Sequence, residues 1–218
     1  MGQFIDSSSS LFELYSAAVR HAGIGPDCNG RCVFRRAGVN ERPEIEAFIR
    51  NGFDRAYRAR INHFMPRLMS LRRDSRLTAA CGLRSAAAEP LFLEIYLDRP
   101  VEDALAAASG HPLSRNSIIE VGNLVVARAG EARRLIIHLT HHLAIAGADW
   151  VVFTAVPALR NSFTRLGIPL LLLAAADSTR LDAAARADWG NYYAGGPTVT
   201  AVNVGAAFNA VRKASCIR

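Results

Sequence analysis

Residues 117–127 carry the sequence S-I-I-E-V-G-N-L-V-V-A, and residues 128–134 continue it as R-A-G-E-A-R-R. The β-branched residues of the first stretch predict a strand, and the loop after it leads into apolar residues at helical spacing as far as Gly147. Where a strand ends in a short loop and a helix begins, unpaired backbone amides and the helix dipole attract an anion. This stretch therefore predicts a strand, a phosphate-binding loop and a helix, with an ordinary solvated turn as the alternative for the loop.

The segments on either side repeat this alternation. Strands are expected over residues 32–36, 77–83, 150–155 and 168–175, and a further apolar run covers residues 91–97. Apolar residues recur at helical spacing after Pro43, after Pro100 and over residues 159–166. The order of strand, helix, strand, helix and strand predicts an α/β domain with helices on both faces of the sheet.

The length of the chain favours a single folded domain. With 218 residues, half of them apolar, it can bury one sizeable core over residues 31–218. Residues 1–30 are expected to form an N-terminal extension, in which the serine run 7–10 can cap a short helix over residues 11–21. The longest apolar run, residues 168–176, is too short to cross a bilayer, and the N-terminus does not resemble a signal peptide. We therefore expect a cytoplasmic protein without stable membrane insertion.

The net charge of +7 comes almost entirely from arginine, since Lys213 is the only lysine. Arginine binds phosphate and carboxylate groups through paired hydrogen bonds. The charge is compatible with a nucleotide-like ligand, an acidic carrier protein, nucleic acid or a solvated basic surface. Because the arginines are scattered along the chain, binding to nucleic acid is not expected.

Neither the cysteines nor the histidines form a metal-binding pattern. Cys28 and Cys32 have three residues between them rather than two, and no second pair follows. His138, His141 and His142 recur at helical spacing, but no glutamate completes an H-E-x-x-H motif. We therefore expect free thiols and no metal.

Residues 160–168, R-N-S-F-T-R-L-G-I, resemble the helix that ends in leucine-glycine-aromatic near the C-terminus of GNAT acyltransferases. The resemblance is closer to the thermostable hemolysin family, a GNAT-like group related to acyl-homoserine-lactone synthases. It extends over about residues 44–205 and is carried by L-F-L-E-I-Y-L-D at 91–98, I-E-V-G-N-L at 119–124, W-V-V-F-T-A at 150–155, L-R-N at 159–161 and W-G-N-Y-Y at 189–193. The resemblance implies a GNAT-like α/β fold, in which helices flank a mixed central sheet.

The resemblance also implies that an acyl thioester lies between the strand of residues 124–127 and the strand that begins at Trp150. Its donor would be acyl-CoA or an acyl carrier protein. Backbone amides would orient the carbonyl and the loop would hold the phosphate, so the donor-binding candidates are Val125, Val126, Ala127, Arg128, Gly130, Ala132, Arg133 and Asn161. The sequence departs from the GNAT pattern at Ala127, where glutamine or arginine is usual, and at Phe163, where a tyrosine often protonates the leaving thiolate.

Glu120 and Asn123 are the catalytic candidates. Acyl-homoserine-lactone synthases have a glutamate on the corresponding strand, in the setting Glu-x-x-Arg, which Glu120 and Asn123 occupy here. Burial would raise the pKa of the Glu120 carboxyl, which suits it to accept a proton from an attacking amine. Binding of the acceptor's ammonium group is a second role, and a structural carboxylate at an edge or paired with Arg84 is the alternative.

The acceptor-binding candidates come from separate parts of the chain. Tyr57, Arg58 and Arg60 precede the core, as basic and aromatic residues do in the synthases, where that segment folds over the acceptor. A solvated helix face is the alternative for them. The remaining candidates are Arg84, Glu94 and Phe153. The acceptor would be a small-molecule amine such as an amino acid.

These features predict an N-acyltransferase of specialised metabolism, which moves an acyl group from the thioester to the amine. The apolar segment 168–175 allows a fatty acyl chain, and a hydroxyl acceptor would give an ester. A catalytically inactive GNAT-like binding protein is one alternative. Another is the membrane-lysing activity that the family name suggests, although the sequence shows no amphipathic insertion element and no disulfide framework. The acyl chain, the acceptor and the oligomeric state stay open.

Overall fold

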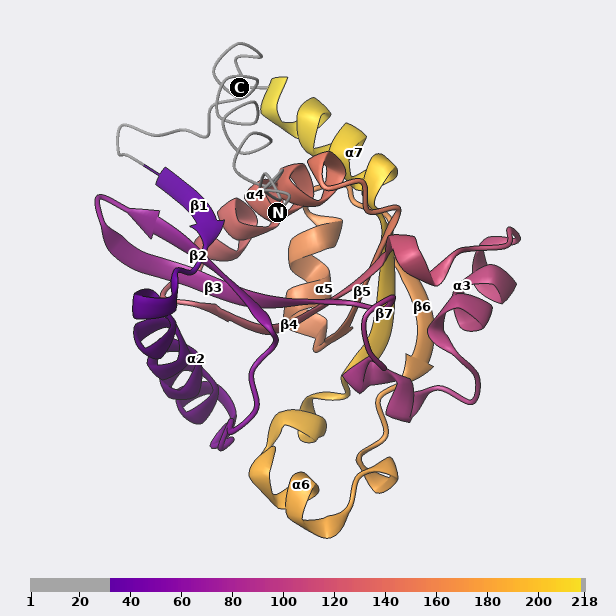
Figure 1. The fold of residues 1–218 in the computed structure, drawn as a ribbon, viewed down its shortest axis with the longest axis horizontal. Helices are drawn as coiled ribbons and strands as arrows, with labels where there is room; N and C mark the ends of the chain where they lie inside the picture. The colour runs from indigo at the N-terminus through magenta and orange to yellow at the C-terminus, as the bar shows by residue number, and fades with distance from the viewer. Residues whose placement is uncertain (1–31, 217–218) are drawn as a thin grey trace, which may run out of the picture.

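The computed structural model describes residues 32–216, and the helix expected over residues 11–21 lies outside them. Within this part of the chain, the strands form one seven-stranded sheet in the order β1-β2-β3-β4-β5-β7-β6 (Figure 1). The strands are β1 Cys32–Arg36, β2 Arg67–Arg73, β3 Arg76–Ser85, β4 Ile118–Val126, β5 Trp150–Ala155, β6 Leu171–Ala175 and β7 Thr198–Asn203. Strands β4 and β5 pair in parallel, whereas all other neighbours pair antiparallel. The mixed central sheet is therefore confirmed.

Helices cover both faces of the sheet, as predicted. Helices α4 (Glu131–Ile145), α5 (Pro157–Thr164) and α7 (Val204–Cys216) pack on one face (Figure 1). Helices α2 (Arg42–Tyr57) and α3 (Val101–Ser109) lie against the other face. The short helix α6 (Ala183–Asp188) belongs to the excursion between β6 and β7, which extends away from the sheet.

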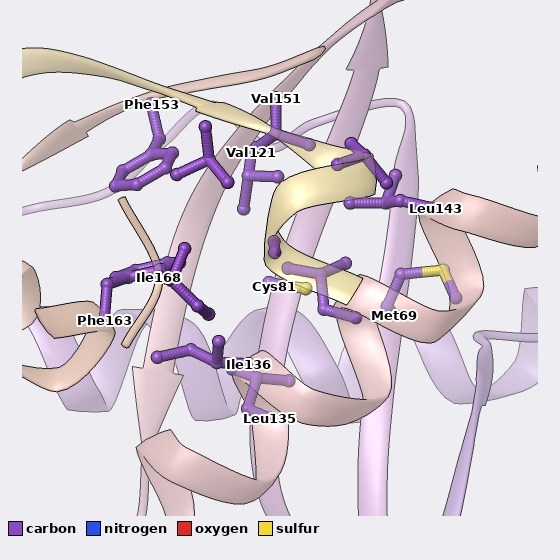
Figure 2. Close-up of a cluster of buried hydrophobic side chains, with 14 of the residues drawn as sticks. Met69, Cys81, Val121, Leu135, Ile136, Leu143, Val151, Phe153, Phe163 and Ile168 are labelled. Atoms are coloured by element: carbon purple, nitrogen blue, oxygen red, sulfur yellow. The ribbon is translucent and has the colours of Figure 1, made fainter. Parts of the chain in front are cut away.

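The largest part of the core lies between the sheet and helices α4, α5 and α7. Figure 2 shows this cluster, in which Leu135 and Ile136 of α4 pack with Val121 and Phe153 of the sheet. Apolar surface removed from water stabilises such contacts by about 25 cal/mol per Å². Because α4 begins shortly after β4 ends, this packing also fixes the loop between the two elements.

Most predicted elements are confirmed. Strands β1 and β5 match their expected ranges, and β3, β4, α3, α4 and α5 differ from them by a few residues. Helix α2, expected after Pro43, ends at Tyr57, because Arg58 has a left-handed backbone conformation with φ 56°. The N–H of Arg58 donates to the carbonyl of Asp54 and closes the helix.

The apolar runs at 91–97 and 168–175 take different forms from buried strands. The first contains the 3-10 helix η2 (Phe92–Tyr96). The second is shortened to β6 at the edge of the sheet, where Leu172 is 58% exposed. The sequence does not predict β2, β7 or α7. In β2, arginines at both ends and a register shift after Leu71 obscure the period of two.

Candidate functional site

The parallel strands β4 and β5 are paired over a short distance. Their ladder joins Ile118–Glu120 to Trp150–Val152 and then ends. Each strand continues along its other neighbour, β4 with β3 as far as Val126 and β5 with β7 as far as Ala155. The sheet is therefore open between the two strands from Val121 onward, and a cavity of about 730 Å³ lies there.

The cavity has an apolar part and a polar part. On the α4 side of the sheet its wall contains Val121, Ile136, Leu139, Leu143, Val151, Phe153, Phe163, Val202 and Ala207 (Figure 2). On the α2 side it is lined by charged, polar and aromatic side chains, namely Tyr57, Arg60, Arg84, Tyr96, Glu120, Asn123, Trp189, Tyr192 and Tyr193. A ligand that fills the cavity needs an apolar portion beneath α4 and a polar portion beside Glu120.

The end of β4 directs a backbone donor toward the cavity. Ala127 donates its N–H to the carbonyl of Thr78, on the β3 side, at 2.8 Å. Successive residues of a strand point their N–H groups to opposite sides, so the N–H of Val126 faces the open side toward β5. Val126 and Val125 both line the cavity, whereas the amide of Ala127, also expected to face the ligand, is engaged within the sheet.

The predicted phosphate loop leads directly into α4. Gly130 precedes the helix with a φ of 94°, and no side chain caps the amides of the first turn. Ala132 in that turn lines the large cavity. Arg128 is exposed and lines a second hollow of about 310 Å³. Both basic and acidic side chains line this hollow, namely Arg73, Arg76, Asp74 and Glu131. The N–H of Glu131 donates to the carbonyl of Arg128 at 3.2 Å, so the amides available to an anion are those that follow it in the first turn.

Three donor-binding candidates lie outside both hollows. Gly130, Arg133 and Asn161 line neither of them. Asn161 is exposed on α5, and Gly130 is exposed at the start of α4. Gly130 and Arg133 belong to the start of α4, whereas Asn161 lies in the middle of α5.

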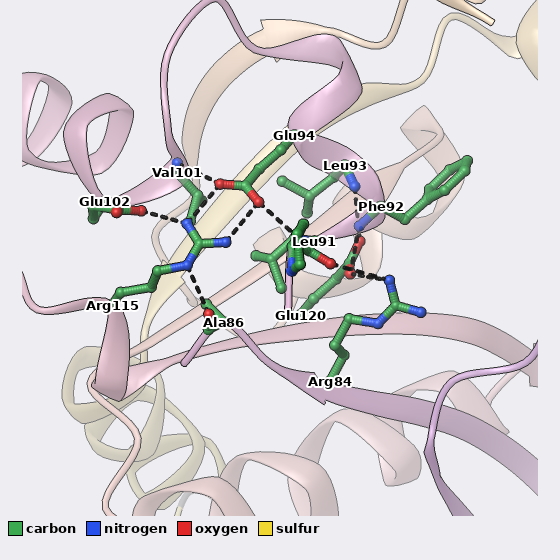
Figure 3. Close-up of polar contacts among 11 residues, drawn as sticks. Arg84, Ala86, Leu91, Phe92, Leu93, Glu94, Val101, Glu102, Arg115 and Glu120 are labelled. Carbon is green, nitrogen blue, oxygen red and sulfur yellow. Dashed lines mark hydrogen bonds and ion pairs between the residues drawn. The ribbon is translucent and has the colours of Figure 1, made fainter. Parts of the chain in front are cut away.

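Glu120 lies at the point where the two strands part, and only 3% of the residue is exposed. Its carboxylate accepts hydrogen bonds from the backbone N–H groups of Phe92 and Leu93, each at 3.0 Å (Figure 3). Nη1 of Arg84, the register partner on β3, lies 4.0 Å from Oε2. Burial raises the pKa of Glu120, while the two amides and Arg84 oppose this rise. Glu120 thus lines the cavity and also lies close to Arg84, and its role as proton acceptor stays a prediction.

Asn123 anchors a neighbouring segment. It has a φ of 51°, close to an irregularity in the β3–β4 ladder. Its Oδ1 accepts a hydrogen bond from the N–H of Met65 at 2.8 Å. Met65 in turn crosses the sheet over Gly82 and Gly122, where an added Cβ would lie 2.4 Å from its side-chain atoms. The two glycines therefore let the segment between α2 and β2 lie flat on the sheet and form one wall of the cavity.

A second wall is aromatic, and sequence reasoning missed its role. Tyr192 donates its hydroxyl to the carbonyl of Thr154 on β5 at 3.2 Å, and Tyr193 shares a hydrogen bond with the hydroxyl of Tyr96. The ring of Trp189 packs 5.0 Å from that of Tyr192. These residues belong to the W-G-N-Y-Y stretch, which was the available signal for this wall.

The acceptor-binding candidates divide into two groups. Tyr57, Arg60, Arg84 and Phe153 line the cavity. Arg58, which closes the C-terminal end of α2, does not line it. Of the three residues named from this part of the chain, Tyr57 at the end of α2 and Arg60 just after it line the cavity, and their contact with an acceptor stays a prediction.

Glu94 is not part of the cavity wall. Its carboxylate receives two hydrogen bonds from the guanidinium of Arg115, each at 2.7 Å, and one each from the N–H groups of Leu91 and Val101 (Figure 3). Arg115 and these amides lower the pKa of Glu94 to about 2. The expectation that Glu94 binds the acceptor is therefore not met, because all these donors hold it in a turn outside the cavity.

The described residues contain no group of three or more His, Cys, Asp or Glu side chains that could hold a metal ion. His138 and His141 are buried, and rings of Phe34 and Phe208 lie 6.0 and 5.0 Å from them. Over residues 32–216, no helix is long and apolar enough to span a bilayer.

Several solved structures share this fold. The N-acyl amino acid synthase FeeM from uncultured soil microbes has a TM-score of 0.58 at 16% identity, covering 87% of this chain and 100% of its own. The CoA-dependent acyl-homoserine lactone synthase MesI has a TM-score of 0.55 at 17% identity, covering 86% and 96%. A second such synthase, BjaI, with SAM and isopentyl-CoA, has a TM-score of 0.57 at 13% identity, covering 85% and 90%. The GNAT-like fold expected from the sequence is confirmed.

No curated protein matches the sequence. Residues 36–208, which include strands β2 to β7 and the residues that line the cavity, match the family model described as thermostable hemolysin. The chain therefore belongs to the thermostable hemolysin family.

Proposed function

We propose that this protein is an N-acyltransferase that moves an acyl group from a pantetheine thioester to the amine of a small molecule such as an amino acid. The observation that carries the proposal is the early end of the β4–β5 ladder at Glu120, with a cavity behind it. A pantetheine arm laid between the two strands would pass the N–H of Val126 and extend along β4, with its thioester carbonyl beside Glu120.

The donor is acyl-CoA or an acyl carrier protein, whose common element is the phosphopantetheine arm. Its phosphate would bind at the uncapped amides after Gly130, with Arg128 beside them. The likeness to two CoA-dependent synthases supports a thioester donor in general. The basic surplus of the chain suits either the phosphates of CoA or an acidic carrier protein.

The apolar part of the cavity would hold the acyl chain. Its wall comes from α4, α5, β7 and α7 and extends beneath α4 as far as Leu143. A helix rises about 1.5 Å per residue, so the path from Ala132 to Leu143 is long enough for a fatty chain. We therefore favour a fatty acyl group over an acetyl group.

Chemistry would occur beside Glu120. The acceptor nitrogen attacks the thioester carbonyl, a C–N bond forms, the C–S bond breaks and the thiolate leaves. Glu120 accepts the proton that the nitrogen gives up. The N–H of Val126 lies six residues further along β4, about 20 Å away at the rise of a strand, and would pair with the pantetheine arm instead. Arg84 lies near enough to Glu120 to bind a carboxylate of an amino-acid acceptor in the same part of the cavity.

The experiment is a thiol-release assay with acyl-CoA and acyl-carrier-protein thioesters of increasing chain length, each against pooled amino acids and polyamines. Mass spectrometry then identifies acylated products. We expect acceptor-dependent thiol release that is strongest with long chains, and a loss of about 100-fold or more in Glu120→Gln. If no thioester is bound or turned over across the panel, the proposal fails.

A binding protein without turnover is the second candidate, and Phe163 is the observation that favours it. Its ring stacks on Phe153 at 4.9 Å within the core, so no hydroxyl is available where many GNAT enzymes have their general acid. This candidate predicts thioester binding by calorimetry without thiol release. Release that requires an acceptor would eliminate it.

A further inference from the structure

The turn at residues 91–97, whose backbone N–H groups of Phe92 and Leu93 donate to Glu120, is anchored by side chains outside the cavity. Arg115 lies just before β4 and sends both terminal nitrogens of its guanidinium to Glu94. The same side chain bonds the carbonyl of Ala86 at 2.7 Å and the carboxylate of Glu102 at 2.6 Å (Figure 3). It thereby ties together the start of the loop after β3, the turn and α3.

Glu94 closes the turn itself. Its Oε2 accepts from the N–H of Leu91 at 2.8 Å, and its Oε1 accepts from the N–H of Val101, the first residue of α3, at 3.0 Å. Phe92 and Leu93, whose amides reach Glu120, lie between these two fixed points in the chain. Neither Glu94 nor Arg115 lines the cavity, so any effect on a ligand must pass through this turn.

We propose that Arg115 and Glu94 are positioning residues for Glu120, because they hold the turn whose two amides grip the Glu120 carboxylate. The inference rests on the proposed role of Glu120 as proton acceptor. A buried carboxylate keeps its charge only when donors compensate for the water it has lost. The two amides supply such donors, and their geometry depends on the turn.

Other charged and polar groups around Glu120 also shift its pKa, each in a defined direction. Arg84 on β3 favours its charged form, the charge of Glu94 disfavours it, and Tyr96 in the same turn also faces it. On β5 the register partner is the uncharged Val152. Removing the charge of Glu94 would therefore, by field alone, lower the pKa of Glu120. Loss of the two amide donors would raise it, so the two effects have opposite signs.

Glu94→Ala separates these effects. If Glu94 positions the turn, we expect the pKa of Glu120 to rise by about one unit, a tenfold change in its protonation constant. The measurement is a pH titration of ¹³C-labelled glutamate carboxyls by NMR, with the Glu120 signal assigned by its absence in Glu120→Gln. The acid limb of the pH–rate profile for acyl transfer should move in the same direction.

Glu41→Ala is the matched control. Glu41 also receives both arms of an arginine, Arg35, and the backbone N–H of Gly38, at a 3-10 turn. That turn donates nothing to Glu120, so Glu41→Ala should lower stability without moving the Glu120 titration. Glu94→Gln keeps one acceptor oxygen and should give a smaller upward shift than Glu94→Ala.

A shift that is downward, or no larger than that of Glu41→Ala, overturns the inference. If Glu94→Ala does not fold, the sign of the shift in Glu94→Gln decides the question in the same way. The NMR titration needs no substrate. If the wild-type protein transfers no acyl group, the proposed function is refuted. The NMR titration would still show whether Glu94 positions Glu120.

Discussion

Oδ1 of Asn123 on β4 accepts a hydrogen bond from the backbone N–H of Met65 at 2.8 Å, across 58 positions of sequence. The bond joins the middle of the sheet to the segment between α2 and β2. Two further bonds, from the guanidinium of Arg42 to the carbonyls of Met65 and Pro66, hold the same segment from the α2 side. One wall of the cavity therefore depends on a side chain that the sequence suggested for catalysis.

We predict that Asn123→Ala destabilises the protein by about 1–3 kcal/mol, because the N–H of Met65 loses its partner in a partly buried position. Alanine also fits poorly at a φ of 51°. Asn123→Gly removes the same hydrogen bond but accepts this backbone conformation, so it should cost less. Urea denaturation gives the free energies of unfolding, and equal losses in the two variants would contradict the argument from backbone conformation.

Gly82→Ala should destabilise the protein more than Gly122→Ala. The Cβ added at position 82 would lie 2.4 Å from Cβ of Met65, an atom fixed by the backbone. At position 122 it would meet Cε of Met65, also at 2.4 Å, and this atom at the end of a flexible side chain can move aside. Thermal unfolding of both variants tests the order. If Gly122→Ala were the less stable variant, the backbone that carries Met65 would have to move aside at position 82, which would contradict the argument.

The buried His138 should make stability depend on pH. Burial, with smaller effects of His141 and Arg134, lowers its pKa to about 4, so the folded state binds fewer protons than the unfolded state. The resulting stability is fully present above the unfolded pKa near 6.5 and is lost as the pH falls toward 4. The loss should reach about 3 kcal/mol.

His138→Leu tests this dependence in urea titrations between these pH values. The variant should flatten the slope of unfolding free energy against pH. His141 and His142 also have lowered pKa values through burial, so part of the slope should survive in His138→Leu. An unchanged slope in His138→Leu would show that His138 is not the group responsible.

Ala207→Leu should shorten the acyl chains that the protein accepts. Ala207 is buried on α7 and lines the apolar part of the cavity. Each methylene that no longer fits should lower kcat/KM by about fourfold, since its burial is worth about 0.8 kcal/mol. Ala210→Leu, on the same helix but outside the cavity wall, should keep the wild-type chain-length profile. A profile that changes equally in both variants would contradict this assignment of the chain.

The sequence predicts the elements whose pattern is local. Helix α4 has a clear apolar face, and β5 is a short run of β-branched and aromatic residues bounded by Asp149 and Pro157. Strand β7 is harder to recognise, because T-V-T-A-V-N leads without a turn signal into α7 at Val204. Its pairing partners, β5 and β6, lie earlier in the chain, and only the folded sheet reveals it.

The site is predictable to a similar extent. Glu120 and the loop at Gly130 stand out because a carboxylate in an apolar strand and a glycine before a helix carry a local chemical signal. The anchoring role of Asn123 does not, since its partner Met65 lies in a segment without periodicity. Glu94 misleads for the same reason, because its carboxylate is neutralised by Arg115, which follows it by 21 positions.

The short ladder between β4 and β5 also has a mechanical consequence. Strands β1–β4 form one continuous antiparallel block and β5–β7 form another, joined at a seam of three residue pairs. If the proposed donor binds in the gap, it would contact both blocks where strand pairs are missing. Donor binding would then also stiffen the sheet, and Glu120 lies at the end of the seam.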